Sequence, residues 1–309
     1  MIQSPLNYTG GKYRLLPQIL PLFPKDIHTF VDLFCGGCNV GINANSQKVI
    51  YNDWNTQLIQ LYQTFLQLGA GAVLDRIHCI IEQYGLSQTA KYGYGYYGLK
   101  NGKGLAAYNK EQYQKLRQDV NQLRAAGALS ADYYIMLYVL IIFGFNNQIR
   151  FNSKGDYNVP VGNRDFNQKL EEKLVLFLTR LENQNKVFAC TDFRNFHIDQ
   201  LISKDFVYAD PPYLITCASY NERGGWDEGM ERDLLEFLDQ LQSKGIRFAL
   251  SNVIRNKGKE NRILMEWIRK NAGLYQMIKL DYSYSNSNYH TKDRTSSTEE
   301  VLIRNYTEH

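Results

Sequence analysis

The stretch Lys204-Asp-Phe-Val-Tyr-Ala-Asp-Pro-Pro-Tyr213 decides the fold. Its apolar, strand-like run ends at Ala209, and Asp210 and two prolines follow directly. Proline lacks the N–H that a strand ladder needs, so the chain must leave the sheet here. Open parallel sheets present their reactive groups at the carboxyl ends of their strands. The stretch therefore predicts an inner strand that presents a carboxylate, stiff carbonyls and the Tyr213 ring. A routine strand-to-loop turn is the alternative.

Further strand-like runs alternate with helical patterns on both sides of this stretch. Strands are expected at 29–34, 48–52, 186–191, 205–209, 246–252 and 299–306. Helices are expected at 12–19, 56–66, 168–182, 229–243 and 262–271. Strands that alternate with helices are typical of α/β proteins with a mainly parallel sheet. The fold class expected is therefore α/β with a Rossmann-like sheet.

The segment 58–163 breaks this rhythm. Its Gly/Tyr-rich part, 92–98, is loop-like, and the apolar run 133–145 is shorter than the ~20 residues of a membrane span, so it predicts a buried helix. Residues 91–154 contain nine Lys or Arg and three acids, although the whole chain has a net charge of only +4. We expect an inserted, mainly helical domain that faces nucleic acid, with 1–57 and 164–309 forming a discontinuous second domain. A solvated basic helix face is the alternative.

Composition and cysteine usage set the broad class. The chain has 309 residues, 44% hydrophobic and 21% charged, which suffices for a globular core. Its five scattered cysteines are an odd number, which favours a reducing cytoplasm over a disulfide framework, and the N-terminus lacks a signal-like pattern. Cys35 and Cys38 form a Cys-x-x-Cys pair that nothing completes into a zinc site, so no metal is expected. The polar segment 283–298 is expected to be a mobile loop.

The run Phe30-Val-Asp-Leu-Phe-Cys-Gly-Gly-Cys-Asn-Val-Gly41 leads from a strand into a glycine-rich turn, where the backbone can approach a ligand closely. It has neither the Gly-x-Gly-x-x-Gly pattern nor the lysine of a phosphate-binding loop. The next strand ends at Asp53, where an acid commonly accepts hydrogen bonds from a ribose. A ribose acid without a phosphate anchor favours a nucleoside-like cofactor, S-adenosyl-L-methionine, although a plain tight turn has the same glycines.

Two weaker signals fit the same cofactor. Asn7-Tyr-Thr-Gly-Gly-Lys12 opens a helix, where its amides and lysine could hold a carboxylate. Thr191-Asp-Phe193 follows another strand, where Phe193 could cover an adenine ring and Asp192 could contact a polar ring edge.

Together these motifs resemble the Dam-type (D12 class, group alpha) DNA adenine-N6 methyltransferases over nearly the whole chain. The motifs also follow the order that the family has. This order is the Gly-Gly-Lys turn, the glycine-rich strand end, the ribose acid, the recognition domain and Asp-Pro-Pro-Tyr. The resemblance implies a catalytic motif and a set of cofactor contacts. The catalytic residues would be Asp210, Pro211, Pro212 and Tyr213, and the cofactor contacts Tyr8, Gly10, Gly11, Lys12, Asp32, Phe34, Gly36, Gly37, Asn39, Asp53, Trp54, Asp192, Phe193 and Asp210.

The segment 145–162 resembles the family's DNA-contacting hairpin, with Ser153-Lys-Gly-Asp156 as its turn. By that resemblance Arg150 reads a guanine and Phe145 intercalates between bases, both of which their chemistry allows. The full set of DNA contacts would be Phe145, Asn146, Asn147, Gln148, Arg150, Asn152 and Pro160. Asn147 and Gln148 stand where the better-known GATC enzymes of this family tend to carry an apolar residue after glycine. Because amide side chains pair with adenine, we expect a recognition sequence other than GATC.

The activity implied is methyl transfer to N6 of a flipped adenine in a short, specific sequence of double-stranded DNA. A cognate restriction endonuclease is a possible partner, and a monomer or weak dimer is expected. The residues alone leave open cytosine-N4, RNA or protein-glutamine methylation, and a DNA-binding regulator on an inactive methyltransferase scaffold. An initial Asp at position 210 argues against the first, and the joint presence of Lys12, Asp53 and Asp210 against the last.

Overall fold

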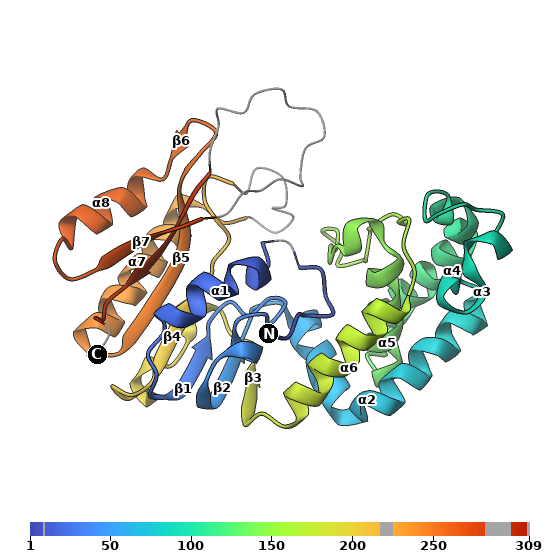
Figure 1. Ribbon diagram of the computed structural model, residues 1–309, viewed down its shortest axis with the longest axis horizontal. Coiled ribbons are helices and arrows are strands. Elements are labelled where there is room, and N and C mark those ends of the chain that lie inside the picture. The colour runs from blue at the N-terminus through green and yellow to red at the C-terminus, as the bar shows by residue number, and fades with distance from the viewer. Residues whose placement is uncertain (9, 217–224, 282–297, 308–309) are drawn as a thin grey trace. The chain divides into compact units, whose positions relative to one another are not determined.

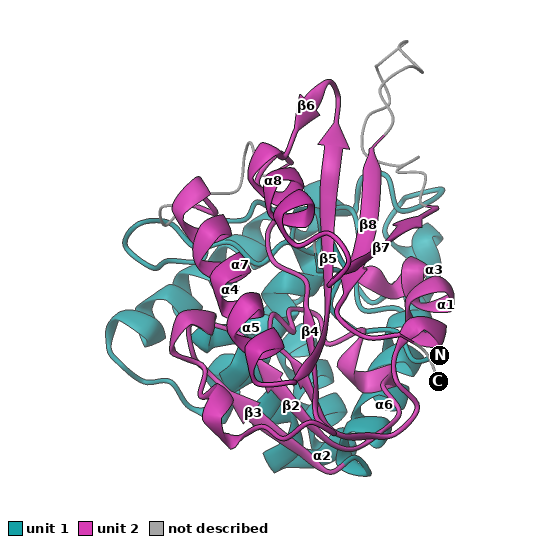
Figure 2. Cartoon of the chain, turned by 90° about the vertical axis from the view of Figure 1, so that its left-hand side faces the viewer, with its two compact units in different colours: residues 1–11, 55–184 teal, residues 12–54, 185–309 magenta. Residues whose placement is uncertain are grey.

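The computed structural model describes residues 1–8, 10–216, 225–281 and 298–307, in two compact units (Figures 1 and 2). Unit 1 consists of Met1–Gly11 and Asn55–Gln184, and unit 2 of Lys12–Trp54 and Asn185–His309. The expected inserted segment, 58–163, lies within unit 1, which also contains the first eleven residues and the helix expected at 168–182.

Unit 2 is built on a sheet with strand order β3-β2-β1-β4-β5-β8-β7. The parallel strands are β1 (Ile27–Asp32), β2 (Ser46–Asn52), β3 (Lys186–Ala189), β4 (Phe206–Ala209) and β5 (Arg247–Asn256). The strands β7 (Gln276–Leu280) and β8 (Glu299–Arg304) are antiparallel, and β6 (Lys259–Glu260) pairs with β5. The expected mainly parallel α/β sheet is confirmed. The strand order reverses between β1 and β4, and ligands of such sheets bind beyond the carboxyl ends of the strands at that switch point.

Apolar side chains cover both faces of this sheet. On one face, α7 (Glu228–Ser243) and α8 (Arg262–Lys270) bury Leu238 and Trp267 against strand residues such as Val207. On the other face, Phe23 packs on the rings of Phe206 and Tyr208, at 4.9 and 5.4 Å between centroids. The helix α1 (Leu16–Ile19) crosses the front of this sheet in Figure 1. This double cover explains why the inner strands are apolar throughout rather than alternating.

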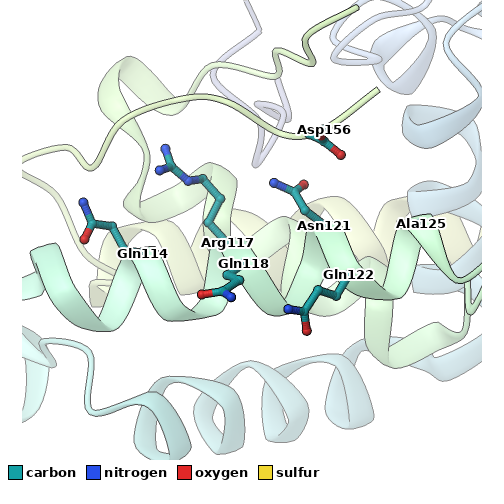
Figure 3. A pocket seen from close by; sticks show the side chains of 7 residues that line it. All are labelled: Gln114, Arg117, Gln118, Asn121, Gln122, Ala125 and Asp156. Carbon is teal, nitrogen blue, oxygen red and sulfur yellow. The ribbon is translucent and has the colours of Figure 1, made fainter. Parts of the chain in front are cut away.

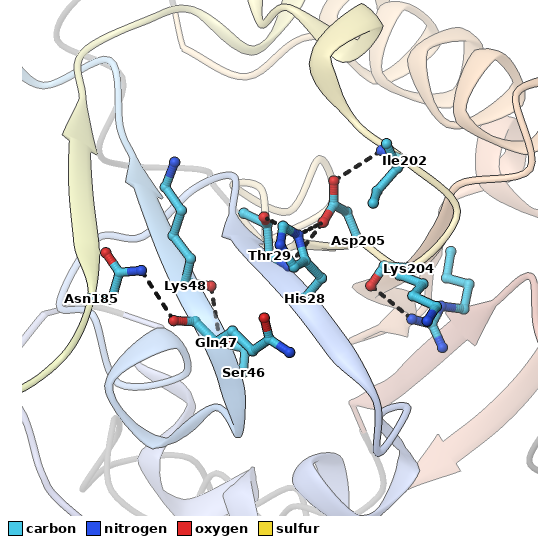
Figure 4. A network of polar contacts seen from close by, with 10 residues as sticks. His28, Thr29, Ser46, Gln47, Lys48, Asn185, Ile202, Lys204 and Asp205 are labelled. Carbon is cyan, nitrogen blue, oxygen red and sulfur yellow. Dashed lines mark hydrogen bonds and ion pairs between the residues drawn. The ribbon is translucent and has the colours of Figure 1, made fainter.

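The amino ends of the strands are held by a separate polar network (Figure 4). The Asp205 carboxylate accepts hydrogen bonds from the backbone N–H of Thr29 (2.8 Å) and of Ile202 (2.9 Å). It thereby joins the start of β1 to the turn that precedes β4. Because this edge is opposite the switch point, we assign the network to the fold rather than to a ligand site.

Unit 1 is helical, with α2 (Thr56–Tyr84), α3 (Thr89–Tyr96), α4 (Leu105–Ala125), α5 (Ala131–Phe143) and α6 (Gln168–Glu182). The buried helix α5 begins where Ser130 accepts a hydrogen bond from the Tyr133 N–H, as its cap position requires. Its Tyr138 ring packs on Phe65 of α2 at 5.1 Å. The stretch Thr56–Tyr96 is long and apolar enough to span a membrane, a test that core helices of soluble proteins also pass. Its buried side chains include Leu58, Phe65 and Ile77, and Gly69, with a φ of 74°, interrupts the helix α2.

Several expectations need correction. The expected loop 92–98 is mostly the helix α3, which is kinked at Gly93 (φ 71°), and the rings of Tyr92 and Tyr96 stack at 4.8 Å. The helix expected at 56–66 runs on to Tyr84, and the one at 12–19 begins as a 3-10 turn, Lys12–Leu15. The strands β6 and β7 were not expected, because β7 is a mostly exposed edge strand without an apolar pattern. Residues 283–297 of the expected mobile loop, and Cys217, lie outside the described residues.

Candidate active site

The first site residue is Asp32, the last residue of β1. Its side chain is buried and accepts a hydrogen bond of 2.9 Å from the backbone N–H of Gly41. Burial raises the pKa of Asp32 to about 7, and the negative charges of Asp53 and Asp210 add to the effect. A glycine is needed at position 41, since a Cβ there would lie 2.5 Å from Cε1 of Tyr51. The turn is thus closed tightly over a carboxylate.

The glycine-rich turn is tied to the end of β2. Gly36, with a positive φ of 44°, donates its N–H to Oδ2 of Asp53 at 3.0 Å. The Cys35 N–H donates to the carbonyl of Asn52 at 2.8 Å. Asp53 is buried, as are Gly37 and Asn39 in the turn. The strand ends of β1 and β2 therefore bring two carboxylates, Asp32 and Asp53, to one glycine-rich turn.

Aromatic rings flank this turn in unit 2. Phe34 lies 5.4 Å from the Phe193 ring and 5.8 Å from the Trp226 ring. Phe193, expected to cover an adenine, is itself buried in the core, whereas Trp54 is 59% exposed. Asp192 forms an ion pair of 2.6 Å with Arg194, which holds the pKa of the Asp192 carboxyl below its usual range.

The motif Asp210–Tyr213, expected to be catalytic, forms a largely buried polar cluster in unit 2. Asp210 follows β4 directly, and its Oδ1 lies 2.8 Å from Nζ of Lys12. The Tyr213 hydroxyl lies 3.0 Å from the same Oδ1 and 2.9 Å from Oε1 of Glu300, on β8. The Lys12 ammonium is also 3.5 Å from Glu300. Burial raises the pKa of Asp210, while the Lys12 charge beside it acts in the opposite direction.

The cluster differs in two respects from what the sequence led us to expect. Lys12 was expected to hold a cofactor carboxylate, and here its ammonium pairs with Asp210 and Glu300. Tyr213 was expected to offer a stacking face, and here it is buried, with the Lys12 ammonium 4.8 Å from its ring centre. Of the two prolines, Pro211 is buried and Pro212 exposed. Glu300 was missed, although an acid beside the apolar run 301–303 was a visible signal.

The Gly-Gly-Lys turn is divided between the two units. Tyr8, Gly10 and Gly11 belong to unit 1. The Gly11 N–H donates to the Tyr8 carbonyl at 3.1 Å, and Gly10 has a φ of 79°, which favours glycine there.

The expected hairpin in unit 1 is a looped segment with isolated bridges rather than regular strands. Phe151 pairs with Tyr157, and Gly144 with Val161. The Asn152 side chain accepts hydrogen bonds from the N–H groups of Lys154 and Asp156, so it forms the turn.

Side chains of the expected DNA contacts differ in what they bind. Asn147 donates to the carbonyls of Ile141 and Ile142, at 3.2 and 2.7 Å, and so caps the end of α5. Arg150 donates through Nε to Oδ1 of Asn158 at 2.8 Å and through Nη2 to its carbonyl at 3.1 Å. Phe145 is 50% exposed, and the Pro160 carbonyl accepts a hydrogen bond of 2.7 Å from its N–H. Asn146 has a left-handed φ of 55°.

One face of α4 braces this segment. Asn121 donates to the Tyr157 carbonyl at 3.1 Å and accepts from its N–H at 2.8 Å. Arg124 forms an ion pair of 2.6 Å with Asp156. Figure 3 shows the neighbouring α4 side chains, which line a pocket of about 480 Å³. Sequence reasoning missed Asn121 and Asn158, although Asn158 lies within the segment 145–162 that was singled out.

Comparisons with known proteins agree with this geometry. The family described as D12 class N6 adenine-specific DNA methyltransferase matches residues 8–298. Type II methyltransferase M.FokI of Planomicrobium okeanokoites is 43% identical over 312 residues, which cover 99% of this chain and 43% of that protein. Modification methylase StsI of Streptococcus sanguinis is 40% identical with the same coverage. The chain thus spans less than half the length of these two relatives.

A relative of more similar length is the DNA adenine methylase of Haemophilus influenzae. It is 29% identical over 253 residues, which cover 80% of this chain and 78% of that protein.

Proposed function

The chain belongs to the D12 class N6 adenine-specific DNA methyltransferases, and on that premise we propose that it transfers a methyl group from S-adenosyl-L-methionine to N6 of an adenine in a short, specific sequence of double-stranded DNA. The observation that carries the proposal is the Asp210 carboxylate, which follows β4 at the switch point of the sheet and is only 18% exposed. Family membership favours adenine N6 over the cytosine, RNA and protein-glutamine substrates that the residues alone leave open.

The acceptor groups around the glycine-rich turn fit this cofactor. Asp53 would accept hydrogen bonds from the ribose hydroxyls, and Asp32 would face the ammonium of the methionine end. The half-buried Phe34 ring offers an apolar surface beside them. When bound, the cofactor supplies an electrophilic methyl group on a positively charged sulfur. A buried carboxylate with a pKa of about 7, such as Asp32, gains a favourable partner when a cation binds beside it.

Asp210 and Pro211 act on the adenine amine. Both contacts that Asp210 makes with the described residues fall on Oδ1, so we assign Oδ2 as the acceptor of one N6 hydrogen. The Pro211 carbonyl accepts the second hydrogen. These two acceptors favour a pyramidal nitrogen, whose lone pair is then available for the methyl group. The carboxylate also stabilises the positive charge that develops on N6. The Lys12 charge opposes the rise that burial causes in the pKa of Asp210.

The segment 145–162 would choose the adenine. Arg150, held in a fixed orientation by Asn158, suits the two acceptors of a guanine edge. The exposed Phe145 ring suits insertion between base steps. Because the Asn147 amide caps α5, we now assign amide readout to Gln148 rather than to Asn147. A Gln–adenine pair at that point supports a recognition sequence other than GATC.

The wider setting follows from the relatives. One relative, StsI, is named a modification methylase. This name suggests a restriction–modification system, in which this chain would protect the sites that a cognate endonuclease cuts. The chain would then act on DNA in the bacterial cytoplasm, as a monomer or weak dimer.

The test is methyl transfer to duplex DNA, followed by single-molecule sequencing to find the modified base and its context. We expect N6-methyladenine in one short sequence. Asp210→Ala should reduce the transfer rate by about a hundredfold or more, with S-adenosyl-L-methionine affinity retained in isothermal titration. The control is Asp199→Ala, which removes an exposed carboxylate that pairs with Lys244 and should change neither quantity. Normal turnover by Asp210→Ala would overturn the proposal.

A further inference from the structure

Tyrosines of α3 and α4 form an exposed aromatic surface on unit 1. We call this surface the tyrosine face, and its members are Tyr92, Tyr94, Tyr96, Tyr97 and Tyr108. Tyr96 is 69% exposed, and Tyr92, Tyr94 and Tyr108 are 39–43% exposed. A Cβ on Gly93 or Gly95, between these rings, would meet nothing within 4 Å, so the backbone there is open as well. Large side chains that gather at a surface in this way are typical of interaction sites.

The rings of the tyrosine face pack on one another. Tyr92 and Tyr96 stack with 4.8 Å between their centroids. Tyr97 makes edge contacts with Tyr96 at 5.0 Å and with Tyr108 at 4.7 Å. This mutual packing occupies part of the ring faces, which a single-stranded nucleic acid would need for base stacking. The surface therefore suits a partner that is bound through hydroxyl groups and ring edges.

The charge around the tyrosine face is positive. The segment 83–110 contains it and has four lysines but no acidic residue. All four lysines are exposed, at positions 91, 100, 103 and 110. The Lys91 ammonium lies 4.9 Å from the centre of the Tyr92 ring, so positive charge and aromatic surface are in direct contact. Such a surface is complementary to an anionic partner, and the phosphate backbone of DNA is a dense row of anions.

The tyrosine face is also tied to the segment 145–162, which we assigned to base recognition. Asn163 directly follows that segment, and its Oδ1 accepts a hydrogen bond of 3.2 Å from the Gly104 N–H, just before α4. Asp165 accepts hydrogen bonds from the N–H and the hydroxyl of Thr89, the first residue of α3, at 2.7 and 2.9 Å. The chain that leaves the recognition segment therefore holds the start of both helices.

We propose that the tyrosine face is a second DNA-binding surface of unit 1, which contacts the sugar–phosphate backbone of duplex DNA beside the bases that the segment 145–162 reads. Its lysines neutralise phosphates, and its tyrosine hydroxyls donate hydrogen bonds to phosphate oxygens. Contacts of this kind position the duplex and are independent of its sequence. This inference rests on the proposed function, in which duplex DNA is the substrate.

The first test is DNA binding as a function of salt, by fluorescence anisotropy with a labelled duplex of about 30 base pairs in about 50–200 mM NaCl. The variant combines Lys91→Gln, Lys100→Gln and Lys103→Gln. We expect its affinity at about 50 mM NaCl to be lower by about tenfold or more. The slope of log affinity against log salt should decrease in magnitude by about 2–3, because each phosphate contact contributes about 0.9. An unchanged slope and affinity would overturn the proposal.

The matched control combines Lys25→Gln, Lys204→Gln and Lys270→Gln. These three exposed lysines belong to unit 2, and the control loses the same charge as the first variant. Its salt slope should therefore stay close to that of the unaltered chain. An equal decrease in both variants would mean that net charge alone weakens binding, and it would count against a defined contact at the tyrosine face.

A second variant combines Tyr92→Phe and Tyr96→Phe, which removes two hydroxyl groups but keeps the rings. We expect the affinity for the same duplex to fall by about threefold or more, with the salt slope unchanged because no charge is lost. Tyr96→Ala shows what loss of a ring adds. Full affinity in the double Phe variant together with weak binding by Tyr96→Ala would indicate ring stacking, and would refute the backbone contact.

Methylation assays separate this inference from the proposed function. They use duplexes of about 12 and about 30 base pairs, each with the methylated sequence at its centre. The lysine variant should keep its kcat on both duplexes, and its KM should rise only for the longer one. If the unaltered chain methylates neither duplex, the proposed function itself fails. If it methylates both, and the lysine variant has a normal KM for the longer duplex, only the role of the tyrosine face is refuted.

Discussion

Asp32 is expected to lower the stability of the cofactor-free protein, so Asp32→Asn should be more stable than the unaltered chain at neutral pH and above. The side chain is buried at the end of β1 and accepts a hydrogen bond from the Gly41 N–H. The amide oxygen of an asparagine at this position can accept the same hydrogen bond. Burial raises the pKa of Asp32 from 3.8 to about 7. The folded chain therefore binds this proton more tightly than the unfolded chain does.

The sign and size of the effect follow from that difference in pKa. Stability from this group is greatest while the carboxyl is protonated in both states, and it decreases as the pH rises through the folded pKa. Each pKa unit corresponds to about 1.4 kcal/mol, so a rise from 3.8 to about 7 amounts to about 4 kcal/mol above neutral pH. At about pH 5.5 the difference between Asp32→Asn and the unaltered chain should be roughly half as large.

Urea unfolding followed by tryptophan fluorescence measures the free energy of unfolding of unit 2. The three tryptophans, Trp54, Trp226 and Trp267, all belong to unit 2, which contains Asp32. Unfolding curves between about pH 5.5 and pH 8.5 give the pH dependence directly. Asp32→Asn should also bind S-adenosyl-L-methionine more weakly, because the carboxylate that destabilises the free protein is the one assigned to the ligand ammonium.

The control is Asp26→Asn. Asp26 pairs with Arg247, which lowers the pKa of its carboxyl, so this substitution should not stabilise the protein. The reasoning about Asp32 is refuted if Asp32→Asn is no more stable than the unaltered chain at about pH 8, or if the difference does not decrease toward acid.

Two further predictions concern packing and recognition. Gly41→Ala would place a Cβ 2.5 Å from the Tyr51 ring and should lower the free energy of unfolding by about 1–3 kcal/mol, measured by thermal unfolding. Gly71→Ala is the control, because nothing lies within 4 Å of its new Cβ, and it should be tolerated in the same measurement. Asn158→Ala removes the side-chain acceptor of Arg150 and should raise methylation at near-cognate sequences relative to the cognate one in single-molecule sequencing; an unchanged ratio would contradict the positioning of Arg150 by Asn158.

Local signals made several elements predictable. The helix α6 has the expected bounds, because Asn167 caps it and its apolar residues recur at helical spacing. The inner strands were visible as apolar runs, since both faces of the sheet are covered. The edge strand β7 and the helix α3 were not found. The first is mostly exposed and lacks a pattern, and the second contains glycines that favour a loop.

The sequence by itself determined that the chain forms an α/β sheet with Asp32, Asp53 and Asp210 at strand ends, because strand runs, glycine turns and a Pro-Pro break are local features. Only the tertiary structure decided what these side chains bind. Glu300 meets Tyr213 across 87 positions of the chain, since β8 pairs with β5 beside β4. From the sequence, Asn147 was likewise expected to read a base, but in the structure its amide donates a hydrogen bond to a carbonyl at the end of α5. Partners of this kind depend on which elements are neighbours in space, and no local pattern in the sequence records it.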